Sequence, residues 1–148
     1  MSKRRFHFRL EPIRVLRKDA EHSVMRELAG ELACAEQLQR DLVALEGRLA
    51  AAQRPTEEAT TAQELSARQL YAERIARECA EARARSERQS RNVEHARIRL
   101  AAATREREKV ELIESRRRGA HDLESRRLET TEANELALLN HARAEGST

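Results

Sequence analysis

The sequence is poor in residues that interrupt a helix. Between Pro12 and Ala142 the only proline is Pro55, and the only glycines are Gly30, Gly47 and Gly119. An interior proline costs a helix about 3 kcal/mol, whereas an isolated glycine costs roughly 1 kcal/mol. We therefore expect one break, near Pro55, with a long helix on each side.

The sequence also has very few aromatic side chains. It contains no Trp, one Tyr (Tyr71) and two Phe (Phe6 and Phe8). Aromatic residues dominate the cores of ordinary globular domains, so such a core is not expected here. Ala, Glu, Lys, Leu and Arg make up well over half of the chain, which is typical of a coiled coil or a long helix. Disorder is the competing interpretation of so polar a chain, and the periodicity of the apolar residues argues against it.

Long apolar runs are absent as well. No segment approaches the roughly 20 apolar residues that cross a bilayer, and the basic N-terminal stretch is not followed by the apolar region of a secretory signal. We expect a cytoplasmic protein in which Cys34 and Cys79 are reduced.

Positive charge is concentrated at the start of the chain. The formal net charge is only +3, and nearly all the basic residues are Arg. Within residues 1–18, one acidic residue (Glu11) stands against a set of basic residues: Lys3, Arg4, Arg5, Arg9, Arg14, Arg17 and Lys18.

The pattern predicts an all-α fold, two long helices in an antiparallel coiled-coil hairpin. We expect a basic arm at 1–11, a single hairpin domain at 12–145 and a frayed tail at 146–148. Within the domain, the first helix covers about 12–53, the turn 54–60 and the second helix about 61–142. Pro12 suits the first turn of a helix. Thr61 and Glu64 have the spacing of a capping box.

Apolar residues form a heptad seam on each predicted helix. The first helix carries Leu28, Ala35, Leu42 and Leu49, alternating with Leu38, Leu45 and Ala52. The second carries Leu65, Ala72, Cys79, Ser86, Val93 and Leu100, alternating with Ile75, Ala82, Gln89, Ala96, Ala103 and Val110. Earlier in the first helix the apolar residues recur mostly every four, which predicts a stutter: Ile13, Leu16, Ala20, Val24, Leu28 and Leu32.

The two seams predict a register for the hairpin. Facing residues of an antiparallel pair have a constant sum of residue numbers, and pairing Leu49 with Leu65 gives 114. This register brings Cys34 near Cys79, which we interpret as two small buried thiols, with a disulfide or a metal pair as the alternative. Favourable i,i+4 ion pairs are expected along the second helix: Glu64/Arg68, Glu73/Arg77, Glu81/Arg85 and Glu87/Arg91.

The same register leaves the end of the second helix without a partner. The first helix ends its pairing opposite about Leu100, and the basic arm could reach as far as Ile113, so residues 114–142 have no partner in the chain. An isolated helix draws most of its stability from packing an apolar face. We expect a partner to bind there, beside the basic arm. Gly119 is either a hinge or a tolerated surface glycine.

Catalytic chemistry has little support in the sequence. No phosphate-binding glycine loop and no nucleophile with a base is recognisable, so we expect no enzyme activity, cofactor or small-molecule substrate. The five His are scattered, and none pairs with a His or Cys at i,i+4, so no metal site is expected. The basic arm and Arg116–Arg118 could neutralise phosphates, but no nucleic-acid motif is present and Arg and Glu nearly balance.

The chain resembles the flagellar export protein FliJ family. The resemblance rests on Arg5–Arg17, Glu27–Ala33, Glu64–Ile75, Arg107–Val110 and the element Asn134–Ala137, in that order over nearly the whole length. Asn134 stands where the family usually has an acid. The resemblance implies a cytoplasmic antiparallel coiled coil at the inner face of the cell membrane, which acts in flagellar protein export.

The resemblance also implies partners. It predicts a stalk whose open end enters the hexameric ring of the export ATPase and whose hairpin contacts the cytoplasmic domain of the membrane export gate, with export chaperones as further partners. The ring-binding residues would be Arg5, Phe6, Phe8, Arg9, Arg14, Arg17, Arg116, Arg117, Asn134, Glu135, Leu136 and Leu139. The gate-facing residues would be Leu38, Leu42, Tyr71 and Ile75. For Leu38, Leu42 and Ile75, hairpin core is the alternative.

Three other functions stay open at this point. The stalk of a virulence-type secretion system has the same architecture. A generic homodimeric scaffold would cover the overhang with a second copy. A nucleic-acid binder would show affinity that falls steeply with salt.

Overall fold

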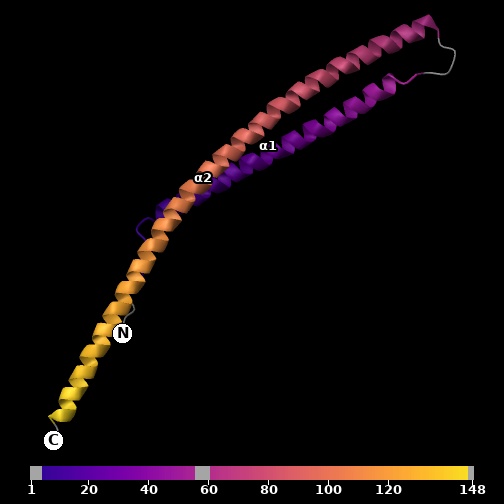
Figure 1. The fold of residues 1–148 in the computed structure, drawn as a ribbon. Helices are drawn as coiled ribbons and strands as arrows, with labels where there is room; N and C mark the ends of the chain where they lie inside the picture. The colour runs from indigo at the N-terminus through magenta and orange to yellow at the C-terminus, as the bar shows by residue number, and fades with distance from the viewer. Residues whose placement is uncertain (1–4, 56–60, 147–148) are drawn as a thin grey trace. The chain divides into compact units, whose positions relative to one another are not determined.

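Two long helices account for nearly all of the described chain. The computed structural model describes residues 5–55 and 61–146, and contains α1 (Glu11–Ala52) and α2 (Ala62–Glu145) with no strand in those ranges. The expected all-α hairpin with a longer second helix is confirmed (Figure 1). The predicted turn and frayed tail lie mostly outside the described residues.

Contacts divide the chain into two units, which we describe separately. One comprises residues 20–103 and the other residues 1–19 together with 104–148. The first unit is hereafter called the hairpin unit, and the second is called the arm unit.

In the hairpin unit, α1 and α2 run antiparallel and bury the predicted seam (Figure 1). Ile75 and Cys79 are fully buried on α2, and Leu42 is buried on α1. The other buried α2 residues are also seam residues: Ala82, Gln89, Val93 and Ala96. The narrow core therefore consists of the alternating heptad residues.

The register of this unit differs from the predicted one. The amide Nε2 of Gln89 donates to the carbonyl oxygen of Glu31 at 2.9 Å and to its Oε2 at 2.5 Å. Arg48 Nη2 donates to Tyr71 Oη at 3.2 Å. These pairs give sums of 120 and 119, and the ion pairs Glu46–Arg83 and Glu27–Arg99 give 129 and 126. All four sums exceed 114, so the predicted register is wrong, by about one heptad at the Gln89 contact.

Buried polarity explains the shift. Moving one helix by seven residues keeps every seam position opposite a seam position, so the apolar pattern cannot distinguish the two registers. In the predicted register Gln89 would face Val24, which has no side-chain acceptor, whereas in the observed register it faces Glu31. An unsatisfied amide is costly to bury, so the register that satisfies Gln89 is favoured.

Two further predictions fail because of this register. Leu65 lies beyond the end of α1 and is 55% exposed. Cys34 is exposed while Cys79 is buried, and both thiols are free, so the pair of buried thiols is wrong for Cys34.

The predicted stutter in α1 is also not observed. Glu21 is buried, and Val24, Leu28 and Glu31 are more protected than Leu32, which is 42% exposed. The protected residues keep the heptad spacing of the later seam. The apolar residues that do not fit this spacing are exposed on the surface of the hairpin.

Local contacts at the start of α2 confirm the capping box. The backbone N–H of Thr61 donates to Glu64 Oε2 at 3.0 Å, and that of Glu64 donates to Thr61 Oγ1 at 3.3 Å. The Glu64 carboxylate therefore takes part in the cap. The Glu73 carboxylate accepts a hydrogen bond from the side-chain amide of Gln69 at 2.9 Å.

The four ion pairs expected along the second helix are absent from the contacts of the described residues. The i,i+4 pairs that do form there include Arg74 with Glu78 and Arg118 with Glu114.

Candidate partner-binding sites

In the arm unit, two phenylalanines hold the basic arm against α2. Phe8 is buried, with 6% of its surface exposed. The Phe6 ring lies between two α2 side chains, with the Arg118 guanidinium 5.2 Å from its centroid and the His121 ring edge-on at 5.5 Å. Such cation–π and edge-to-face contacts add to the apolar burial. The arm therefore covers α2 as far as His121.

Arg14 adds an electrostatic contact between α1 and α2. Its Nε and Nη2 donate to the two carboxylate oxygens of Glu11 at 2.9 and 2.5 Å, and Nε lies 3.7 Å from Glu114 Oε2. Glu114 also accepts from Arg118 at 2.7 Å. The hydrogen bond from Arg14 lowers the pKa of Glu11 and raises that of Arg14 itself.

These contacts correct the predicted overhang. Glu114, expected to be the first residue without a partner in the chain, contacts Arg14, and the arm reaches His121 instead of Ile113. For the described residues of the arm, the contacts on α2 extend to His121.

The predicted ring-binding residues divide into two groups. Phe8 is buried, and Phe6 and Arg14 are half-buried, so these three fasten the arm to α2. The remaining residues are exposed: Arg5, Arg9, Arg17, Arg116, Arg117, Asn134, Glu135, Leu136 and Leu139.

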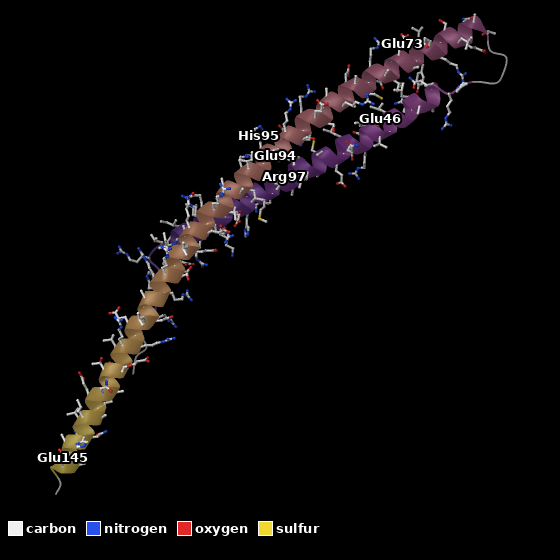
Figure 2. The ribbon with its side chains drawn as sticks, viewed as in Figure 1. Glu46, Glu73, Glu94, His95, Arg97 and Glu145 are labelled. Atoms are coloured by element: carbon white, nitrogen blue, oxygen red, sulfur yellow. The ribbon has the colours of Figure 1, made fainter. Side chains whose placement is uncertain are left out.

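The last turns of α2 are apolar on more than one side. Leu136, Leu138 and Leu139 are 50%, 71% and 55% exposed. At about 100° per residue, Leu136 and Leu139 lie on one side of the helix and Leu138 lies on another. Figure 2 shows α2 continuing to Glu145 beyond the hairpin unit. Exposed polar residues, among them Asn134, Glu135 and Asn140, stand between these leucines. Large apolar side chains exposed this close together mark an interaction surface. Leu138 was not among the predicted ring-binding residues, although its neighbours in the sequence were.

The predicted gate-facing residues are mostly inside the hairpin. Ile75 is 0% exposed, Leu42 is buried and Leu38 is half-buried. Tyr71 is 45% exposed and accepts from Arg48. Its neighbour Leu70 is 64% exposed. A partner of the closed hairpin can therefore reach Tyr71 and Leu70 but not Ile75.

Gln89 and Glu31 form a polar pair across the hairpin seam. The prediction placed Gln89 in the seam but did not assign its partner, because Glu31 reads as an ordinary surface residue in a Glu-rich helix. The signal was available, since a seam amide requires an acceptor on the facing helix.

The described residues contain no group of three or more His, Cys, Asp or Glu side chains that could hold a metal ion. Within those same ranges, neither helix has an apolar stretch long enough to cross a membrane.

Comparison with known proteins gave one finding. A family model described as flagellar FliJ protein matches residues 6–146. No curated protein and no solved structure matches the chain.

Proposed function

Because the chain belongs to the flagellar FliJ protein family and is a flagellar export-associated protein, we propose that it is the central stalk and regulator of the export ATPase ring. In this role it is non-enzymatic and cytoplasmic, lies at the inner face of the cell membrane at the flagellar base, and links the ATPase hexamer to the membrane export gate. Export chaperones are further partners in this proposal.

The end of α2 carries the proposal. Leu136, Leu138 and Leu139 are at least half exposed and point in different directions, so a groove on one side would leave part of this surface in water. A ring that surrounds the helix would cover all three. The exposed Arg116 and Arg117 lie earlier on the same helix, where they would suit acidic groups lining such a ring.

The gate contact is proposed at the exposed residues near the start of α2. Tyr71 and Leu70 present an aromatic and an aliphatic side chain to solvent, a combination common in protein interfaces. Leu42 and Ile75 support this surface from inside the hairpin. Leu38 lies away from Tyr71, in a groove with Arg85 and His95.

Leu136→Asp/Leu139→Asp tests the ring contact. We expect this double variant to remain helical and to lose binding to the cognate export ATPase by at least tenfold, because two charges enter an apolar enclosure. Ile98→Asp, at a position 59% exposed in the hairpin unit, is the control and should bind normally. Normal binding by the double variant would place the ATPase contact elsewhere.

A further inference from the structure

Three arginines of the hairpin unit lie together without a carboxylate partner. Residues 83–99 contain six Arg and two Glu. Three of the Arg are paired: Arg83 with Glu46 at 2.7 Å, Arg97 with Glu94 at 3.8 Å, and Arg99 with Glu27 at 2.8 Å. The other three make no ion pair or hydrogen bond in the part of the chain that the structure describes: Arg85, Arg88 and Arg91.

All three unpaired arginines line one groove. Leu38 contributes to it from α1, and Gln89, Asn92 and His95 contribute from α2. No acidic residue lines it, and the paired arginines of the same stretch lie outside it. Figure 2 labels His95 on this part of α2, beside Glu94 and Arg97. The groove is therefore lined by all the arginines of residues 83–99 that have no ion-pair partner among the described residues.

The arrangement is unfavourable for the hairpin alone. Arg85, Arg88 and Arg91 follow one another at i,i+3, where like charges on a helix repel. Glu81 and Glu87, placed in the sequence to pair with Arg85 and Arg91, form no such pair. The amides of the groove are already committed, since Gln89 donates to Glu31 and Asn92 donates to Gln89 at 3.3 Å. A ligand is therefore recognised by the guanidinium groups and by apolar contact.

We infer that this groove binds an acidic amphipathic helix of another protein. Residues from both helices line it, so a third helix can pack there as in a helical bundle. Carboxylates of that helix would pair with Arg85, Arg88 and Arg91, which favour bidentate contacts. An apolar side chain between the carboxylates would rest on Leu38, which is half-buried.

A protein helix fits this groove better than a nucleic acid does. No aromatic residue lines the groove, so bases have no surface on which to stack. Leu38 offers nothing to a phosphate backbone. The inference does not depend on the stalk role, because it concerns a different surface.

The test uses fluorescence anisotropy with the full chain. The probe is a labelled 20-residue amphipathic peptide that carries Glu along both edges of a Leu stripe. Arg85→Glu/Arg88→Glu/Arg91→Glu should weaken binding by about tenfold or more, as expected for the loss of three exposed ion pairs. The matched control makes the same charge change at exposed α2 residues outside the groove: Arg77→Glu/Arg105→Glu/Arg126→Glu. It should change affinity less than about twofold on the same basis.

Three outcomes would overturn the inference. Equal losses in both triple variants would show non-specific attraction. Equal binding by a peptide in which Gln replaces every Leu would show that apolar contact does not contribute to binding. A 20-nucleotide single-stranded RNA that bound more tightly, through the same three arginines, would identify a nucleic-acid site. If the Glu triple variant lost helical circular dichroism, the neutral variant Arg85→Gln/Arg88→Gln/Arg91→Gln would replace it. Its peptide affinity would then be compared with that of the control variant in the same way.

Discussion

Gln89 and Glu31 show how single residues fix the alignment of an otherwise repetitive hairpin. The amide of Gln89 is buried in the seam and donates to both the carbonyl and the carboxylate of Glu31. A polar residue at one core position of a coiled coil selects register at some cost in stability. The same argument applies here, because sliding by one heptad would leave the amide facing Val24.

Gly30 and Gly47 are residues that the hairpin itself does not require. Both lie inside α1, and an added Cβ would have no atom within 4 Å at either position. We expect Gly30→Ala and Gly47→Ala each to raise the free energy of unfolding by about 1 kcal/mol, because Ala restricts the unfolded chain and favours the helix.

Thermal and urea unfolding followed by circular dichroism measure this effect. Ala29→Gly, at an exposed neighbouring position, is the control and should lower stability by a similar amount. Destabilisation by either Gly→Ala variant would mean that another chain approaches the helix closely at that glycine.

At the scale of elements, the sequence predicts the helices better than their alignment. The seam of α2 follows the heptad from Ile75 to Val110, and the capping box at Thr61 is observed as expected. Both rest on local patterns, which a single sequence contains. The register rests on contacts between distant residues, and a heptad repeat makes neighbouring registers nearly equivalent.

The candidate sites show the same limit. Phe6 and Phe8 were predicted as partner contacts, because an apolar residue in a basic arm has no visible partner in the sequence. In the structure Phe6 packs on Arg118 and His121, which are more than a hundred residues away in the chain. Leu136 and Leu139 were placed correctly on the surface, because a helix end beyond its partner is a local consequence of helix lengths.

Disulfide trapping tests the register with the native Cys79. In a Cys34→Ser background, Leu42→Cys places a thiol opposite Cys79 in the observed register, whereas Ala35→Cys does so in the rejected one. We expect mild oxidation to cross-link Leu42→Cys and to leave Ala35→Cys reduced, because a disulfide requires Cα atoms within about 7 Å. Efficient cross-linking of only the Ala35→Cys variant, measured by gel mobility, would contradict the observed register.

The first turn of α1 is expected to lose stability in acid. The hydrogen bond from Arg14 lowers the pKa of Glu11, so the ion pair contributes to stability above the ordinary carboxyl pKa and loses that contribution as pH falls through the depressed value. Hydrogen exchange of residues 5–14, corrected for the intrinsic effect of pH, should show protection at pH 7 that declines below about pH 4.

Glu11→Gln is the control for this titration. It should show weaker protection at neutral pH and a smaller decline in acid. An unchanged acid response in that variant would assign the effect to other carboxylates.

At the scale of the whole molecule, the two units present different surfaces. The hairpin unit has exposed Tyr71 and Leu70 on α2, and it also has the groove with Arg85, Arg88 and Arg91. The arm unit has an exposed apolar helix end that follows the arm contacts. The formal net charge is only +3, so partners are selected by these local surfaces more than by long-range attraction.

Removing residues 123–148 should separate folding from partner binding. The contacts described for the arm reach His121, so the truncated chain keeps these contacts and the hairpin seam. We expect its thermal midpoint to stay within a few degrees of that of the full chain, as measured by circular dichroism. A large loss of stability would mean that the end of α2 supports the rest of the fold.

ATP hydrolysis by the cognate flagellar export ATPase tests the stalk role most directly. Increasing amounts of the full chain are added while turnover and sedimentation of the ATPase are measured together, with the chain truncated after Asp122 as the control. The stalk role predicts that substoichiometric full chain raises turnover and shifts the ATPase to a hexamer, and that the truncated chain does neither. Unchanged turnover and sedimentation with the full chain would contradict the stalk role.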